Sequence, residues 1–540
     1  MESTVDRPRC YALVVSLRDL DVLVLDAQAT GASPAHGNLL ELGWAWARGD
    51  DSDVDVRTRL IAQPEGAKLP KIITRVTGID AAALGRARPF DEVWAELSAT
   101  CKEHLPARAV VHCARFELSF LQPMAPEGAL PFDTLCTLEL ARRLLPDLPR
   151  RGLRALAGYF GLGIEQLRRS EDHVRATAFV WQHLVPLLAE SGIEDWDDAL
   201  ALTHEDAPRR GRKVFPLARE KRLALPDQPG VYRMLRSNGD LLYIGKATSL
   251  RRRVNSYFQK QARRDERMLE LLSQVRDLDV TPTATPLEAA LLETDSIKLL
   301  EPPYNLALLG EARTPCFASK DLQETATEPS PEFPVGPLPS AWRQRRQVGL
   351  GRLLAGERDQ SAVTQAFGWT PEELPADVLE AGMEQFLERN PRVRSSFLGA
   401  GLVRWNSQAR KEVADERDDD TSWDAARVLR NLEDTLVFFA LEVRRGRWLR
   451  RLANAAISFD DGVQRTLVFR GGRVRSRYDD EKLVDVRPAE PSFDIATYDR
   501  LRVLTTELRR IVQEGRRVRI RFAGGRSLSA EAVARMLPWV

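Results

Sequence analysis

The stretch PGVYRMLRSNGDLLYIGK, Pro229–Lys246, decides the fold of the central part of this chain. Two β-rich runs flank the turn Ser237-Asn238-Gly239-Asp240, and Asn-Gly favours the positive φ values of a tight turn. The stretch therefore predicts a β-hairpin that ends in the run YIGK.

Helical patterns follow the hairpin. The segment TSLRRRVNSYFQKQA has Thr248 or Ser249 as a plausible N-cap, and DERMLELLSQVRD begins at Asp265, another N-cap type. A strand and the apolar helix PLEAALLETDSIKLLEP come next. We predict a small α/β domain over residues 223–312.

The remainder of the chain predicts a multidomain α/β protein. The order strand, strand, helix, strand, helix begins near Leu20 and predicts an α/β domain over residues 1–200, for which the resemblance described below implies a mixed sheet with helices. The other expected parts are a basic linker at 201–222, an irregular connector rich in Pro, Ser, Thr and Glu at 313–340, and a mainly helical C-terminal region with a short β element at 341–540.

The composition is that of a globular protein, with 540 residues, 43% hydrophobic and 29% charged residues and a formal net charge of +1. No run approaches the ~18 apolar residues of a membrane span, and the N-terminus carries no readable secretory signal. The five cysteines form no CxxC pair, which argues against a disulfide framework or a structural zinc site. We expect a cytoplasmic protein without a membrane partner.

The central motifs resemble those of the GIY-YIG nuclease family, in particular the incision domain of UvrC and its short relative Cho. The segments that carry the resemblance are LPDQPGVY, LLYIGKATSLRRRVNSYF, TPLEAALLETDSIKLLEP and PPYNLALL. The resemblance covers about one sixth of the chain and implies hydrolysis of a DNA phosphodiester. That reaction needs an activated water and a cation against the charge on the phosphate oxygens.

The resemblance implies a role for each matching residue. Glu293 would hold one Mg²⁺ or Mn²⁺, and the planar fork of Arg253 would clamp the scissile phosphate. Tyr243 would be the general base, with Lys246 and the metal lowering its pKa from about 10. Gly245 would allow close backbone approach. Phosphate and water positioners would be Tyr232, Tyr257 and Asn305.

A basic cluster follows the YIG motif. Between Lys246 and Arg267 eight cations face only two acids, Asp265 and Glu266. Such a patch neutralises backbone phosphates without reading sequence. Its members are Lys246, Arg251, Arg252, Arg253, Lys260, Arg263, Arg264 and Arg267.

The first 190 residues resemble the DEDDh exonucleases of the DNA polymerase III epsilon class, which have a ribonuclease H-like fold. The segments LDAQATG, NLLELGWA, VVHCARFELSFL and HVRATAFVWQHL carry this resemblance. Of the family's catalytic shell only Asp26 is unchanged, whereas Gln28 replaces Glu, Glu117 replaces Asp, Arg168 replaces His and His173 replaces Asp. Two Mg²⁺ ions repel each other and need several carboxylates, so we predict a fold that has lost hydrolysis and binds DNA or a partner.

Asp172, next to His173, offers a possible substitute for the missing carboxylate. A shift of one residue on a helix turns the side chain by about 100°, away from the site. We therefore expect no rescue by Asp172.

The leading interpretation is a metal-dependent endonuclease of nucleotide excision repair. Its partners would be DNA and proteins of the UvrA and UvrB type, or a polymerase clamp. Two alternatives stay open at this point: a 3′–5′ exonuclease with an altered metal shell, and a non-catalytic DNA-binding or clamp-associated adaptor. Aromatic and basic residues also mix in the C-terminal region, where accessory DNA binding and an ordinary core stripe are equally plausible.

Overall fold

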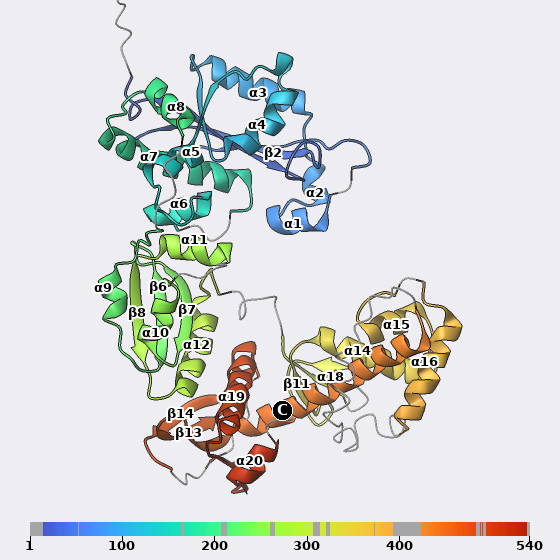
Figure 1. The fold of residues 1–540 in the computed structure, drawn as a ribbon. Coiled ribbons are helices and arrows are strands. Elements are labelled where there is room, and N and C mark those ends of the chain that lie inside the picture. Colours follow the sequence, from blue (N-terminus) through green and yellow to red (C-terminus); the bar gives the residue numbers. More distant parts are fainter. Residues whose placement is uncertain are drawn as a thin grey trace, which may run out of the picture. The chain divides into compact units, whose positions relative to one another are not determined.

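The computed structural model of the chain divides into two compact units (Figure 1), each described by itself. The first comprises Met1–Leu225, Arg233–Tyr243 and Arg251–Asp279, and the second comprises Pro226–Tyr232, Ile244–Leu250 and Val280–Val540. The structure describes residues 15–536 except 52, 68, 164–166, 207–212, 260–264, 306–313, 320–323, 372, 392–422, 482–485, 488 and 490–492.

The N-terminal domain is built on a five-stranded mixed sheet of order β3-β2-β1-β4-β5. Strand β1 pairs antiparallel with β2 and parallel with β4, which makes the sheet mixed, as the exonuclease resemblance implied. The strands are β1 (Asp21–Ala29), β2 (Leu39–Arg48), β3 (Arg57–Leu60), β4 (Arg108–Val111) and β5 (Asp133–Cys136).

Helices cover both faces of this sheet because successive β1 side chains point to opposite sides. Val22 and Val24 pack with Trp181 of α7, whereas Leu23 and Leu25 pack with the helices on the other face. The first layer holds α5 (Thr137–Leu144), α6 (Leu153–Phe160) and α7 (Ser170–Glu190), and the second holds α3 (Phe90–Lys102) and α4 (Ala114–Leu121).

Short helices complete this domain and enter the expected linker. Two of them, α8 and α9, extend into residues 201–222, where the basic sequence predicted a connection without regular structure. Asp195 caps α8 by accepting the N–H of Asp198. The short helices are α1 (Lys71–Thr77), α2 (Ala81–Leu84), the 3₁₀ turns η1 (Gln122–Met124) and η2 (Pro126–Gly128), α8 (Trp196–His204) and α9 (Arg219–Leu223).

The central domain has the predicted hairpin. Gly239 adopts the positive φ of 88° that the Asn-Gly turn requires. Asp265 and Thr285 cap the helices that follow them. The elements are β6 (Gly230–Leu235), β7 (Leu241–Ala247), α10 (Leu250–Ser256), α11 (Glu266–Gln274), β8 (Asp277–Pro282) and α12 (Pro286–Leu300), and the sheet order is β7-β6-β8.

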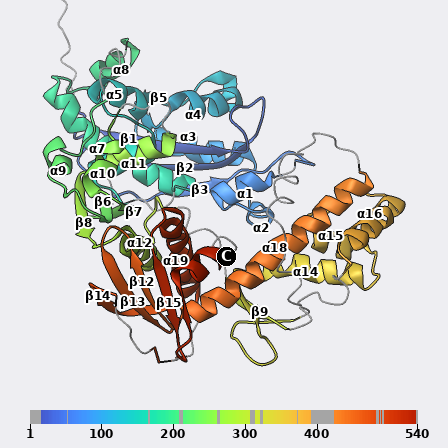
Figure 2. The same cartoon turned by 60° about the horizontal axis from the view of Figure 1, so that its bottom comes forward.

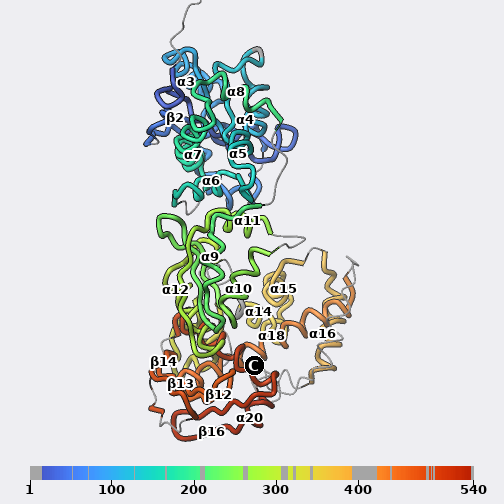
Figure 3. The backbone as a smooth tube through the Cα atoms, turned by 60° about the vertical axis from the view of Figure 1, so that its left-hand side comes forward, coloured from blue at the N-terminus to red at the C-terminus, as the bar shows by residue number. Residues whose placement is uncertain are grey.

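Within the first unit, α11 packs against α6 (Figure 3). A Cβ at Gly158 of α6 would lie 1.9 Å from the Oε1 atom of buried Gln274, so the contact needs glycine. Gln274 Oε1 also accepts hydrogen bonds from the guanidinium of Arg236. Helix α11 thus packs closely on α6, with the Gln274 side chain against Gly158.

The expected irregular connector at 313–340 contains regular structure. Three short strands spread along it form an antiparallel sheet that packs on Phe439 and Val443 of α18. The composition did not predict this sheet because its apolar runs are short and prolines separate them. The strands are β9 (Cys316–Ala318), β10 (Thr325–Ala326) and β11 (Val335–Leu338).

The predicted helices dominate the next segment. Asp424 caps the long helix α18, and a core of Leu350, Phe367, Phe386 and Leu432 joins the four helices. They are α14 (Ala341–Leu354), α15 (Gln360–Phe367), α16 (Ala376–Arg389) and α18 (Ala425–Leu452).

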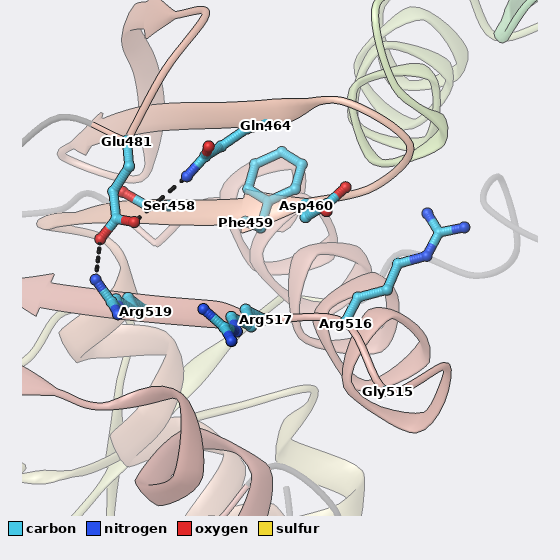
Figure 4. A pocket seen from close by; sticks show the side chains of 9 residues that line it. All are labelled: Ser458, Phe459, Asp460, Gln464, Glu481, Gly515, Arg516, Arg517 and Arg519. Atoms are coloured by element: carbon cyan, nitrogen blue, oxygen red, sulfur yellow. Dashed lines mark hydrogen bonds and ion pairs between the residues drawn. The ribbon is translucent and has the colours of Figure 1, made fainter.

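The C-terminal β element is a five-stranded antiparallel sheet of order β14-β13-β12-β15-β16, larger than the short element expected. A pocket beside β12 and β15 holds Glu481 between Gln464 and Arg519 (Figure 4). The elements are β12 (Ala455–Asp460), β13 (Gln464–Arg470), β14 (Arg473–Tyr478), α19 (Ile495–Gln513), β15 (Val518–Phe522), β16 (Ser527–Leu528) and α20 (Ala530–Met536).

Helix α12 lies beside α19 within the second unit (Figure 2). Leu287 and Leu291 of α12 belong to the same apolar core as Leu504 of α19 and Ile457 of β12. One face of α12 is therefore part of the C-terminal core. In the described residues, no helix is both long and apolar enough to cross a membrane.

Candidate nuclease sites

Glu293 and Lys246 meet through a hydrogen bond. The backbone N–H of Lys246, near the end of β7, donates to Glu293 Oε1 of α12 at 2.8 Å. The Glu293 side chain is half-buried. The YIGK motif and the acidic helix, 47 residues apart in sequence, are thus joined where the sequence predicted one site.

Tyr232 of β6 packs directly on Gly245 of β7. A Cβ at Gly245 would lie 2.2 Å from the Tyr232 hydroxyl oxygen, a distance that real Cβ atoms do not show. Tyr232 is fully buried. The glycine of YIG therefore provides the close approach that we expected, and the group it admits is the tyrosine of the first motif.

Asn305 forms hydrogen bonds with the backbone of β7 at Ile244, the residue after Tyr243. Its Oδ1 accepts the N–H of Ile244 at 2.8 Å, and its Nδ2 donates to the carbonyl of Ile244 at 2.7 Å. Asn305 is buried, whereas Tyr243 is half-buried. The phosphate- or water-positioning role predicted for Asn305 stays a prediction, and the structure adds a role in holding the strand.

Arg253 lies on α10, with its guanidinium 5.0 Å from the centre of the Tyr257 ring. Arg253 is exposed and Tyr257 is half-buried, so the pair combines an accessible cation with a supporting ring. Arg251 and Arg252 are also exposed on α10. Three predicted members of the basic cluster lie outside the described residues: Lys260, Arg263 and Arg264.

The side chain of Lys246 has a partner that sequence reasoning missed. Its Nζ lies 2.5 Å from Oε1 of Glu507, on α19. The expectation that its ammonium lowers the pKa of Tyr243 stays a prediction. No local signal could have found Glu507, because 261 residues separate the pair.

The exonuclease-like site centres on Asp26 of β1, a buried carboxylate. Its Oδ2 accepts a hydrogen bond from Gln28 Nε2 at 2.7 Å, and its Oδ1 lies 3.1 Å from His173 Nδ1 of α7. Burial alone lowers the pKa of His173, but the hydrogen bond and charge of Asp26 outweigh burial and raise this pKa. An amide and a basic imidazole thus engage both oxygens of the carboxylate.

Glu117 of α4 is buried beside Asp26. Its Oε2 accepts the backbone N–H of Ala27 at 2.7 Å. Burial, followed by the charge of Asp26, raises the pKa of Glu117 well above its usual value.

Asp172 and Arg168 both lie at the N-terminal end of α7. Asp172 accepts the backbone N–H groups of Arg168 and Arg169 with Oδ2, at 3.2 and 3.1 Å, and thus closes the N-terminus of α7. The Arg168 side chain is exposed. Asp172 is therefore occupied with helix capping, as its turn away from the site predicted. Among the described residues, no group of three or more His, Cys, Asp or Glu side chains is arranged to hold a metal.

Glu117→Gln is expected to flatten the pH dependence of stability in this domain. Because the folded pKa of Glu117 is raised, its stabilising effect is complete below the usual pKa and is lost as the pH rises through the folded value. His173, also raised, acts in the same direction above about pH 6.5. As the pH rises from about 5 to about 9, the unfolding temperature should fall less for the variant than for the wild type. Parallel curves for both proteins would contradict this assignment.

Comparison with family models identifies two domains. The model described as Exonuclease matches residues 23–178, and the model described as UvrC-like GIY-YIG domain matches residues 228–306. The first match contains Asp26 and His173, and the second contains Tyr243, Arg253 and Glu293.

Two curated proteins are similar to parts of the chain. A Mycobacterium tuberculosis protein named as a bifunctional exonuclease/endonuclease is 31% identical over 304 residues, covering 54% of this chain and 45% of its own length. UvrABC system protein C of Nitrosomonas eutropha is 50% identical over 84 residues, covering 16% of this chain and 14% of its own length.

The chain thus spans less than half the length of these curated relatives. The crystal structure of the N-terminal GIY-YIG domain of Thermotoga maritima UvrC, described as bound to magnesium, is 34% identical, with a TM-score of 0.15. It covers 16% of this chain and 94% of its own. Residues 23–178 of the chain thus resemble an exonuclease family, and residues 228–306 resemble the UvrC-like GIY-YIG family.

Proposed function

We propose that this chain is a metal-dependent DNA endonuclease of the UvrC type that acts in nucleotide excision repair. The observation that supports this most is the hydrogen bond from the Lys246 N–H to Glu293, since it joins the YIGK motif to the acidic helix. The matching family model adds weight, because it spans both segments.

Glu293 is the residue that would hold a single Mg²⁺ or Mn²⁺. One carboxylate, oriented by a backbone N–H, suits a small hard cation that keeps several of its waters. Such an ion, when bound, supplies positive charge against the non-bridging oxygens of the phosphate.

Arg253 and Tyr243 would perform the other steps. The guanidinium of Arg253, supported by the Tyr257 ring, would grip the scissile phosphate and stabilise charge that develops during attack. The phenol of Tyr243 would take a proton from the attacking water. By family resemblance the cut leaves a 5′ phosphate.

The exonuclease-family domain would bind DNA or a protein partner rather than cut. His173 and Gln28 engage both oxygens of Asp26, and Asp26 and Glu117 supply only two carboxylates, fewer than two divalent cations require. DNA with UvrA- and UvrB-like proteins, or a polymerase clamp, are the proposed partners.

A nicking assay on lesion-bearing and undamaged duplexes tests this function. We expect Mg²⁺-dependent nicking that a chelator removes, and we expect Asp26→Asn to nick as well as the wild type. The same reactions should release no mononucleotides from labelled 3′ ends. Release of mononucleotides that Asp26→Asn abolishes would instead favour the exonuclease alternative.

A further inference from the structure

The Lys246–Glu293 hydrogen bond is held from both sides by the C-terminal region. On the donor side, Glu507 of α19 pairs with the Lys246 ammonium at 2.5 Å. On the acceptor side, Asp461 Oδ2 accepts the N–H of Leu287 at 3.0 Å, in the first turn of the helix that bears Glu293. Neither acid belongs to the segment that matches the GIY-YIG family model.

Arg510 links the two acids. Its Nε donates to Glu507 Oε2 at 2.8 Å, and its terminal nitrogen donates to Asp461 Oδ2 at 2.8 Å. The side chains of Glu507 and Asp461 are only 10% and 1% exposed, so solvent screens this network weakly. The bonds to Glu507 and Asp461 outweigh burial and raise the pKa of Arg510. The arrangement is therefore a stable connection between β7 and α12.

Further contacts hold α12 to the same region. Glu288 pairs with Arg465 at 3.0 Å, Asp295 with Arg500 at 2.6 Å, and Lys298 with Asp499 at 2.9 Å. Because Leu287 and Leu291 lie in the C-terminal core, both polar and apolar contacts fix this helix. The placement of α12, and of Glu293 with it, thus depends on residues more than 150 positions away in sequence.

We propose that Glu507 and Asp461 are positioning residues of the nuclease site. They set the geometry between the Lys246 N–H and the Glu293 carboxylate, and through it the affinity of the site for its divalent cation. The inference rests on the proposed function, because it concerns the same carboxylate. Groups that orient a metal ligand commonly change metal affinity by about 10–100-fold when they are removed.

The contacts favour positioning over an inhibitory latch. Glu507 retains Arg510 as a partner whether or not Lys246 is present, so its carboxylate is fixed independently of DNA. Lys246, by contrast, gains a fixed side chain only from Glu507, as far as the described contacts extend. The pair therefore orders Lys246, and with it the backbone N–H that Glu293 accepts.

The test measures Mn²⁺ binding by electron paramagnetic resonance, alongside nicking, in the full chain. Glu507→Gln should weaken Mn²⁺ binding about tenfold and raise the Mg²⁺ concentration for half-maximal nicking equally, with little change in KM for DNA. Asp461→Asn should act in the same direction. Glu481→Gln is the matched control, since it breaks a pair with Arg519 on the C-terminal sheet (Figure 4). It should change neither readout.

A double-mutant cycle separates positioning from a general loss of stability. Lys246→Met keeps the backbone N–H but removes the ammonium, so adding Glu507→Gln to it should have no further effect on Mn²⁺ affinity. Additive losses, an unchanged affinity in Glu507→Gln, or faster nicking by that variant would each overturn the proposal. If Glu293→Gln binds Mn²⁺ and nicks normally, the proposed function fails instead.

Discussion

Glu293→Gln is expected to lower the rate of DNA nicking by about three orders of magnitude. The amide keeps the size of the side chain and can still accept the Lys246 N–H, but it removes the negative charge that would hold a divalent cation. Because the fold should survive, the loss should appear in kcat while DNA binding remains close to that of the wild type. Initial nicking rates at saturating Mg²⁺ provide the measurement.

Glu301→Gln is the matched control for this variant. Glu301 is an exposed carboxylate at the C-terminal end of α12, so its replacement removes the same charge from the same helix. We expect wild-type nicking from it. Substantial nicking by Glu293→Gln, with a normal unfolding temperature, would show that this carboxylate does not serve the reaction.

Local patterns predicted the elements of the central domain because their causes are local. The Asn238-Gly239 turn, the cap at Asp265 and the apolar face of α12 depend on residues within a few positions of each other. For these elements the sequence was sufficient.

Contacts between distant segments could not be predicted in this way. The pairing of Lys246 with Glu507 depends on how α19 packs against α12, and no spacing rule connects those helices. The small sheet of β9, β10 and β11 was missed because its strands are only two to four residues long and pack on α18, which is distant in sequence. Both features depend on tertiary packing between distant segments, which local residue patterns do not predict.

Arg253→Lys is expected to lower kcat for nicking by about 10²-fold, the cost typical of losing one transition-state donor. Lysine keeps the charge but lacks the planar fork that binds two phosphate oxygens and stacks on a ring, as Arg253 does on Tyr257. Single-turnover nicking at saturating DNA isolates the step. A rate within about threefold of the wild type would exclude a specific role for the guanidinium.

Arg252→Ala separates this role from simple attraction of DNA. Arg252 is exposed on the same helix and belongs to the basic cluster, so its loss should weaken DNA binding and reduce the salt dependence by about one phosphate contact. Its single-turnover rate at saturating DNA should stay close to that of the wild type. If both variants changed only binding, Arg253 would be one more member of the basic cluster, because a residue that stabilises the transition state must affect the rate of the bound complex.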